Sequence, residues 1–136
     1  MDYKGYCLWA DDVPSPEHPH YIVVTSSENE EGMCLLVAIS SIKYGRDGSP
    51  KYYDKACVID VGDIVDSNGK DIIVKPSFIR YQYAQEKSIK SLMSYQFQNR
   101  YKYKCKISDQ LLKRIQNGVL VSEEIEPRFK KYSDYF

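Results

Sequence analysis

Short segments rich in β-branched and aromatic residues alternate with polar, turn-forming segments over the first two thirds of the chain. This alternation is typical of β-strands joined by hairpins and loops. The nearly unbroken apolar run at 33–42 fits a buried helix equally well by periodicity, but its β-branched residues and tight flanking loops favour a strand. We therefore expect about six strands, at residues 4–10, 20–25, 33–42, 56–60, 71–74 and 78–83.

Two connecting segments carry recognisable turn chemistry. Asn68-Gly69 supplies the positive φ angles of a tight turn between two of the short strands. The segment 43–53 contains Gly45, Gly48 and Pro50 among basic residues. We expect this segment to be a basic loop, and loops carry function more often than strands do.

The hydrophobic pattern changes after Ala84. Within 85–97, Ile89, Leu92 and Met93 recur at three- and four-residue spacing. This spacing places them on one face of a helix, so a helix is predicted over 85–97.

Serine start signals predict two further helices near the C-terminus. Ser108 is a good N-cap for a helix at 109–116, and Asn117-Gly118 is a fitting stop. Ser122, followed by two glutamates, repeats the start signal for a last short helix. The pattern as a whole predicts one domain over residues 1–136, mainly β (α+β), with a small barrel and short C-terminal helices.

The composition is that of a folded domain with an unusual number of tyrosines. Hydrophobic residues make up 43% of the 136-residue chain and charged residues 28%, which is ordinary globular usage. The 13 tyrosines fit half-buried strand positions, and they also offer stacking faces for a ligand.

The formal net charge of zero conceals a segregation of charge. Residues 1–34 carry seven acids against Lys4 alone, whereas residues 87–106 carry six bases and no acid. The two segments could simply face each other in the fold. Alternatively, the basic stretch tracks phosphates, because aromatic residues alternate with its bases, namely Tyr95, Phe97, Tyr101 and Tyr103.

The cysteines bear on redox state and metal binding. Cys7, Cys34, Cys57 and Cys105 are widely spaced, which argues against a zinc site and for reduced thiols. The chain opens with no leader pattern and contains no apolar run near the ~20 residues of a membrane span. We therefore expect a cytoplasmic protein.

The residues able to do chemistry are few. Both histidines, His18 and His20, lie in one Pro-rich heptapeptide, and no P-loop, Rossmann glycine pattern or Gly-x-Ser-x-Gly elbow is present. Histidine, the hydroxyls of Ser40-Ser41 and nearby cations suit RNA cleavage by the neighbouring 2′-hydroxyl, which needs a base, donors to the phosphorane and an acid. The residues expected to bind RNA are Lys43, Arg46, Lys51, Lys75, Arg80 and Tyr81.

Several short motifs follow one another in a recognisable order, which is Leu8-Trp9-Ala10-Asp11, the Pro-bearing loop 14–19, the apolar strand 20–25, Ala38-Ile39-Ser40-Ser41 and Ser77-Phe78-Ile79-Arg80. This order, together with the terminal helices, resembles the MazF/PemK/Kid toxins. The resemblance covers most of the chain. It implies an SH3-like barrel, a homodimer and cleavage of single-stranded RNA without a metal or other cofactor.

The resemblance also assigns roles to residues. The family's Thr-Ser hydroxyl pair falls on Ser40 and Ser41. Its catalytic arginine falls near His18 or His20, and a histidine there would act differently, because histidine titrates near neutrality whereas arginine stays charged. We expect His20 to be the general base or acid, since it adjoins a strand that holds it in place.

Each of these residues also has a purely structural interpretation. In this interpretation either histidine is hydrogen-bonded in its loop, and the serine pair only ends a strand. Arg80 then pairs with an acid on a neighbouring strand. Asp54 and Asp63 orient a histidine or, more simply, cap turns. Trp9 is expected in the core.

Three functions remain open from the sequence. The first is an endoribonuclease toxin neutralised by a separately encoded antitoxin. The second is a non-catalytic SH3-like module that binds nucleic acid or protein through the Tyr/Lys-rich stretch. The third is an interaction module without a nucleic-acid ligand.

Overall fold

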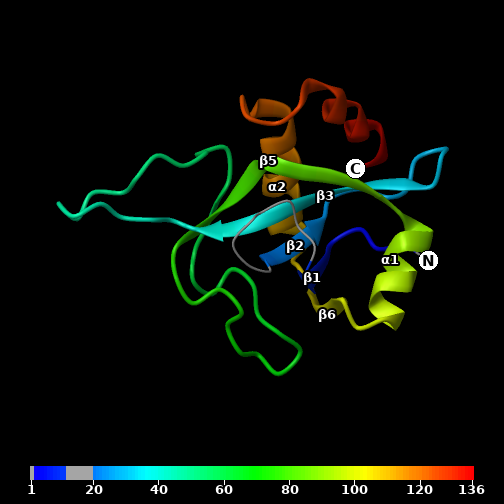
Figure 1. The fold of residues 1–136 in the computed structure, drawn as a ribbon, viewed down its shortest axis with the longest axis horizontal. Helices are drawn as coiled ribbons and strands as arrows, with labels where there is room; N and C mark the ends of the chain where they lie inside the picture. Colours follow the sequence, from blue (N-terminus) through cyan, green and yellow to red (C-terminus); the bar gives the residue numbers. More distant parts are fainter. Residues whose placement is uncertain (1, 12–19) are drawn as a thin grey trace.

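Six antiparallel strands form one sheet in the computed structural model, which describes residues 2–11 and 20–136 (Figure 1). The order across the sheet is β4-β5-β3-β2-β1-β6, so β4 and β6 lie at its edges. The strands are β1 (Tyr6–Ala10), β2 (His20–Val24), β3 (Met33–Ser41), β4 (Val58–Ile59), β5 (Ser77–Ser88) and β6 (Tyr101–Lys106). The predicted mainly β (α+β) class is confirmed.

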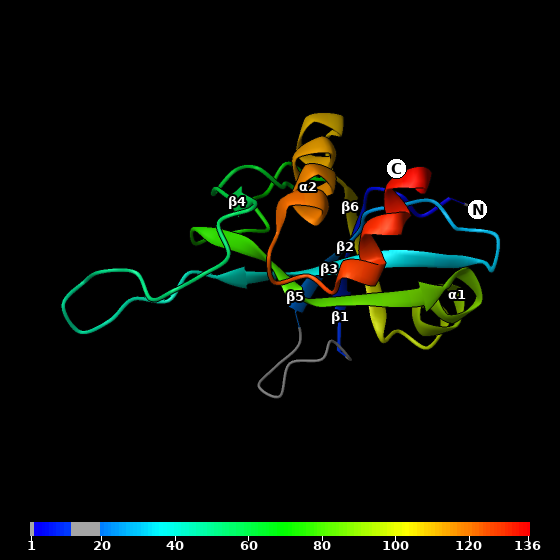
Figure 2. The ribbon, with the colours of Figure 1, turned by 90° about the horizontal axis from the view of Figure 1, so that it is seen from above.

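Helices lie on both sides of this sheet. Helix α2 (Asp109–Val121) and the 3-10 helix η1 (Pro127–Tyr135) lie on one side, and α1 (Ile89–Phe97) lies at one end near the other side (Figure 2). We call the two sides of the sheet the α2 face and the α1 face. No helix in the described part of the chain is both long and apolar enough to cross a membrane.

The α2 face is closely packed around Tyr81 of β5. The Tyr81 side chain is fully buried, and its hydroxyl donates a hydrogen bond of 2.7 Å to the carbonyl of Ile115 in α2. Gly118, one turn further along α2, leaves the space that the ring occupies, since a Cβ there would lie 1.9 Å from the Tyr81 hydroxyl oxygen. Glycine at 118 therefore allows α2 to lie close against β5.

Charged and polar contacts attach η1 to the same side of the sheet. Arg128 forms an ion pair of 2.7 Å with Glu86 of β5, and the Tyr132 hydroxyl donates a hydrogen bond to the same carboxylate. The backbone N–H of Ser27 donates to the carbonyl of Tyr135. The C-terminal segment is thereby bound to the strands.

Two of the strand predictions are wrong in extent or existence, and one strand was missed. Residues 71–74 form only an isolated bridge between Val65 and Asp71, although the predicted turn exists and Gly69 has φ +78°. The predicted strand 56–60 is reduced to the two residues of β4. Strand β6 was not predicted, because its alternating lysines and aromatics were interpreted as a binding surface and not as an edge strand.

The helix predictions are correct in kind and wrong at their ends. Residues 85–88 continue β5, because they pair with Met33–Leu36 of β3, and α1 begins only after Ser88, whose side chain caps it. Ser108 caps α2 as predicted, but α2 continues through Gly118 to Val121. Ser122 ends that helix and does not begin another.

The cysteines and Trp9 complete the comparison with the sequence. All four cysteines are free thiols, as predicted, and the structure buries all of them. Trp9 is only half-buried and packs edge-on against Tyr21, with 4.7 Å between the ring centroids, so its assignment to the core is wrong.

Candidate functional site

The strand register aligns His20 of β2 with Ser40 of β3 on one face of the sheet, although no hydrogen bond joins the two side chains. His20 pairs with Ala10 of β1, and Ser40 pairs with Phe78 of β5. Between β2 and β3, Ile22 pairs with Ala38, and continuing this register places His20 opposite Ser40. Cross-strand neighbours point to the same face of a sheet. We call this line the His20 row, which consists of Tyr101, Ala10, His20, Ser40 and Phe78.

The His20 row lies on the α1 face. Ala10 and Tyr101 belong to the apolar cluster of that face, which also contains Ala38 and Leu92 of α1. The alanines at 10 and 38 leave room beside the longer polar side chains of the row. The row therefore places a histidine and a serine beside the apolar cluster of this sheet face.

The Ser40 hydroxyl differs from the buried hydroxyls of Thr25, Tyr81 and Ser122, which all donate hydrogen bonds. His20 and Ser40 are each 7% exposed. The Ser40 Oγ atom is buried and has no hydrogen-bond partner within the residues that the structure describes. Such a group costs about 1–3 kcal/mol of desolvation, so its presence requires an explanation beyond packing.

Arg80 adds a positive charge in the next row. It pairs with Ala38 across β3 and β5, so it lies on the same face as Ser40, one pleat further along. Its guanidinium carbon lies 4.6 Å from the centroid of the Tyr83 ring. Arg80 is half-buried, and within the described ranges it forms no ion pair with a carboxylate. The alternative of a structural salt bridge therefore finds no support there.

Ser41 and Ser77 form the neighbouring cross-strand pair at the end of β3 and β5. Ser41 is half-exposed and accepts a hydrogen bond of 3.2 Å from the ammonium of Lys43. The Ser77 hydroxyl donates to the carbonyl of Lys75, and the Lys75 side chain is exposed. The two predicted cations Lys43 and Lys75 thus flank the end of the sheet that carries Ser40 and Ser41.

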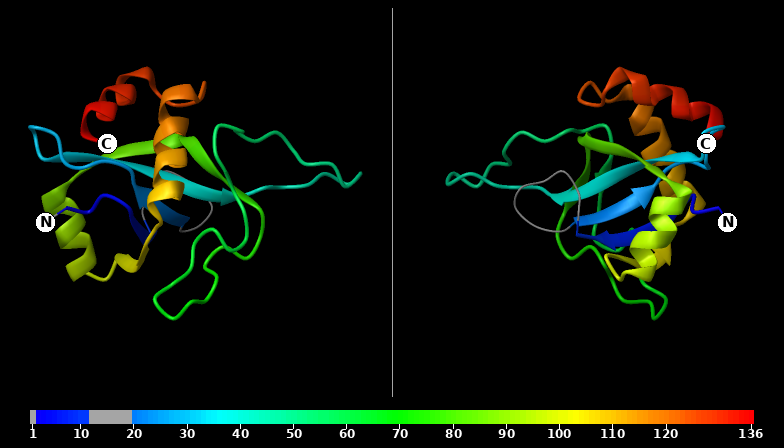
Figure 3. Two further views of the ribbon diagram at one scale, coloured as in Figure 1. Left: turned by 180° about the vertical axis from the view of Figure 1, so that it is seen from behind. Right: turned by 45° about the vertical axis from the view of Figure 1, so that its right-hand side comes forward.

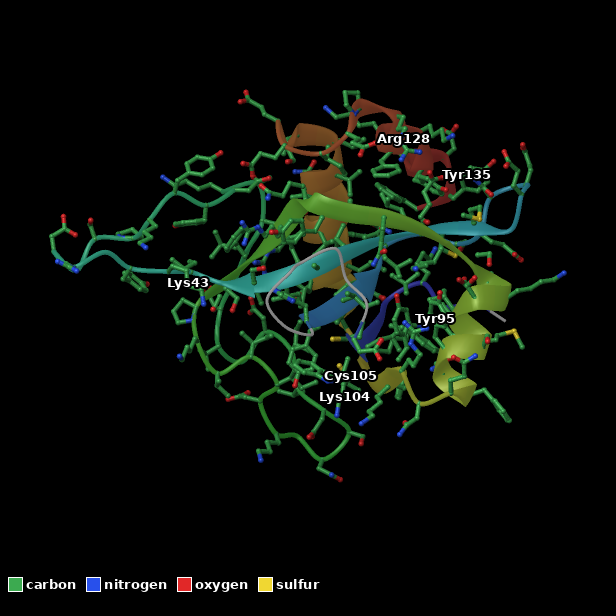
Figure 4. The ribbon with its side chains drawn as sticks, in the orientation of Figure 1. Lys43, Tyr95, Lys104, Cys105, Arg128 and Tyr135 are labelled. Atoms are coloured by element: carbon green, nitrogen blue, oxygen red, sulfur yellow. The ribbon has the colours of Figure 1, made fainter. Side chains whose placement is uncertain are left out.

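A long hairpin, which we call the arm (residues 42–55), extends the sheet beyond this end (Figures 1 and 3). Its tip is closed by the bridge between Tyr44 and Pro50 and by a hydrogen bond from the Gly45 N–H to the Ser49 carbonyl. The predicted cations Lys43, Arg46 and Lys51 are all exposed on the arm, and Lys43 lies at its base where β3 ends (Figure 4).

One acid lies within the tip of the arm. The Asp47 carboxylate accepts hydrogen bonds from the hydroxyl and the N–H of Ser49, at 2.7 and 3.0 Å. These bonds lower the pKa of Asp47. Asp47 therefore stabilises the turn, and the cations of the arm point into solvent.

Other predicted site residues lie elsewhere. Tyr81 is in the core of the α2 face, where it cannot touch RNA, and burial raises the pKa of its hydroxyl. His18 lies outside the described residues. Asp54 accepts hydrogen bonds from the Ala56 N–H and the Ser122 hydroxyl, and Asp63 accepts one from the Asp60 N–H. Both aspartates therefore cap turns, as the simpler interpretation holds.

Two residues of this region were missed by the sequence interpretation. Tyr83 lies beneath the Arg80 guanidinium, and Ser77 lies opposite Ser41. The alternation within 78–83 shows that Arg80 is followed by aromatic rings, but only the register assigns Ser77 its partner.

The site can supply an imidazole, a buried hydroxyl and a guanidinium from three adjacent strands. No group of three or more histidine, cysteine or acidic side chains that could hold a metal ion occurs among the described residues. Comparison of the chain with protein-family models and with curated proteins found no match.

Proposed function

We propose that this protein is a metal-independent endoribonuclease that cleaves single-stranded RNA at the His20 row. The observation that carries the proposal is the Ser40 hydroxyl, which is buried without a partner in the described part of the chain and lies in the same row as His20. A donor held in this way costs stability in the free protein, and it can meet a ligand oxygen once the side chains that cover it move aside.

The proposed reaction needs three roles. His20 takes the proton of the 2′-hydroxyl, and the 2′-oxygen forms a bond to phosphorus. Ser40 donates a hydrogen bond to a phosphorane oxygen, and Arg80 offsets its negative charge. The bond from phosphorus to the 5′-oxygen breaks, and that oxygen leaves with a proton from the imidazolium or from water. The products are a 2′,3′-cyclic phosphate and a 5′-hydroxyl.

The arm supplies the proposed RNA contacts outside the row. Lys43, Arg46 and Lys51 project into solvent next to the sheet end that carries Ser41, and Lys75 lies at the same end. Lysine and arginine positioned along a path neutralise successive phosphates. The arm is therefore proposed to hold the strand on one side of the scissile bond.

The resemblance to the MazF/PemK/Kid toxins extends the proposal. In this view the sheet is an SH3-like barrel, the protein is a cytoplasmic homodimer, and a separately encoded antitoxin neutralises it. The antiparallel sheet of short strands with C-terminal helices agrees with such a barrel in class.

The test is to incubate the purified full chain with single-stranded RNA in EDTA and to analyse the fragment ends. We expect 2′,3′-cyclic phosphate and 5′-hydroxyl ends from the wild type and intact RNA from His20→Ala. Ser133→Ala, which changes an exposed serine of η1, is the matched control and is expected to cleave like the wild type. RNA that is bound but left intact by the wild type would overturn catalysis in favour of the non-catalytic module.

A further inference from the structure

The basic stretch that follows α1 lies at an edge of the sheet, and its lysines have no role in the His20 row. It forms β6, an edge strand whose outer side pairs with no other described strand. We define the β6 surface as the exposed side chains along this edge strand and at the end of α1, namely Phe97, Lys102, Tyr103, Lys104 and Lys106. Lys102 pairs with Trp9 and Tyr103 pairs with Leu8, so these two side chains leave the edge strand on opposite faces of the sheet. Figure 4 shows Lys104 on β6, next to Cys105.

The lysines of the β6 surface are not used within the protein. Lys102 and Lys106 are exposed and Lys104 is half-exposed. None of the three forms an ion pair within the part of the chain that the structure describes. The nearby carboxylate of Asp66 instead accepts hydrogen bonds from the N–H groups of Asn68 and Lys70 in its own turn.

Two aromatic rings of the β6 surface are open to solvent. Phe97, at the end of α1, is 93% exposed, and Tyr103 is 50% exposed. The Tyr103 ring is held edge-on against Tyr6, with 5.0 Å between the centroids, so its position is fixed. Tyr103 lies between Lys102 and Lys104 along the edge strand. Cations and exposed rings that follow one another along a path are the combination on which unpaired bases stack while phosphates are neutralised.

Phe97 and Tyr103 differ from the other rings of the same stretch. Tyr101 is buried in the His20 row, and Tyr95 packs against it while the Arg100 guanidinium covers the Tyr95 ring at 4.5 Å. Arg100 also pairs with Asp11 at 3.3 Å. These residues therefore support the β6 surface and do not belong to it. The ion pair between Arg100 and Asp11 is one contact between the acidic N-terminal segment and the basic stretch.

We propose that the β6 surface binds single-stranded RNA as a second contact region, separate from the His20 row. The choice of RNA over another polyanion rests on the proposed function. Lysines along an edge strand disfavour pairing with the strand of another protein, which speaks against a peptide occupant. Tyr101 and His20 belong to one row with β1 between their strands, so β6 lies about 10 Å from β2, within reach of an RNA bound at the row.

The experiment measures RNA binding separately from cleavage. A fluorescently labelled single-stranded RNA is titrated with the full chain carrying His20→Ala, which we expect to leave the RNA intact, and anisotropy gives the affinity at several salt concentrations. Into this background are placed Lys102→Gln/Lys104→Gln and, separately, Phe97→Ala/Tyr103→Ala. The matched control is Lys113→Gln/Lys131→Gln, which removes two exposed lysines from α2 and η1.

We expect the β6 lysine variant to weaken binding about 10-fold at low salt and to reduce the slope of log affinity against log salt by about 1 to 1.5. The aromatic variant is expected to weaken binding at least fivefold with an unchanged salt slope. Affinities equal to the control for both variants would overturn the second contact region. Because wild-type cleavage is measured separately, intact RNA together with weakened β6 variants would refute catalysis and leave this surface standing.

Discussion

The two faces of the sheet differ in how their polar groups are satisfied. On the α2 face the buried hydroxyl of Tyr81 donates to a helix carbonyl, and at the end of α2 the Ser122 hydroxyl donates to Asp54. On the α1 face the Ser40 hydroxyl has no partner in the described ranges. The apolar cluster of the α2 face contains 20 buried residues among those described, twice the 10 of the α1 face.

From this difference in buried polar groups and in cluster size, we infer that the two faces have separate roles. The α2 face, covered by α2 and η1, contains most of the buried apolar surface and therefore most of the stability. The α1 face contains His20, Ser40 and Arg80, which are not members of its apolar cluster. Substitutions on the two faces should therefore separate stability from activity.

The largest expected effect is on the α2 face, at Gly118. Gly118→Ala would place a Cβ 2.5 Å from Cζ of Tyr81, so either the ring or α2 must move. Overpacking of this kind costs about 1–3 kcal/mol, and losing the bond from Tyr81 to Ile115 adds about 1 kcal/mol. Urea unfolding of Gly118→Ala should show this loss. Asn117→Ala, exposed on the same helix, should stay within about 0.5 kcal/mol of the wild type.

Two buried serines give a matched pair. Ser122→Ala removes the 2.6 Å bond to the Asp54 carboxylate and should cost about 1–3 kcal/mol. Ser40→Ala removes a hydroxyl with no described partner and should leave the free energy of unfolding unchanged or raise it by about 1 kcal/mol. Equal destabilisation by both substitutions, measured by urea unfolding, would contradict the proposed difference between the faces.

The dependence of the unfolding free energy on alkaline pH tests whether water is excluded from the α1 face. Cys34 belongs to its cluster, and burial, aided by Glu28 and Asp2, raises the pKa of the thiol from 9.0 to about 12. Burial of the neutral Cys34 thiol therefore contributes fully to the free energy of unfolding below pH 9.0. This contribution falls by about 1 kcal/mol per pH unit as the pH rises toward 12, because the unfolded state releases the thiol proton first. Between these values, the unfolding free energy of Cys34→Ala should fall less steeply with pH than that of the wild type. Parallel slopes would show that water reaches Cys34.

The smallest effect on stability is expected in the arm. Arg46→Glu/Lys51→Glu changes two exposed side chains and should alter the free energy of unfolding by less than about 0.5 kcal/mol. RNA cleavage at low salt should nevertheless fall about 10-fold, and the difference should shrink at high salt as phosphate contacts are screened. Cleavage that is insensitive to both substitutions would remove the arm from the proposed site.

Local patterns predicted the elements better than their ends. The apolar run at 33–42 correctly indicated β3, and Ser108 correctly indicated the start of α2. Residues 85–88 have a helical pattern, yet they continue β5 because pairing with β3 outweighs local preference. Gly118 was expected to stop a helix, and only the position of the Tyr81 ring explains why glycine lies within α2.

The candidate site was predicted as a set of residue types and not as an arrangement. His20 and Ser40 are twenty positions apart in the sequence, and only the register of β2 and β3 places them opposite each other. Alternation in β5 leaves both faces possible for Arg80 and Tyr81, and the structure places Arg80 on the α1 face and Tyr81 in the core. Which face a strand buries depends on helices far along the chain.

The most direct test measures single-turnover cleavage of single-stranded RNA in EDTA by the wild type and by Ser40→Ala, with the free energy of unfolding determined on the same preparations. We predict that Ser40→Ala lowers the cleavage rate about 10² to 10³-fold, because a donor to the phosphorane is lost, while stability is unchanged or slightly higher. A wild type that leaves the RNA intact, or a Ser40→Ala variant that cleaves at the wild-type rate, would contradict the assignment of catalysis to this face.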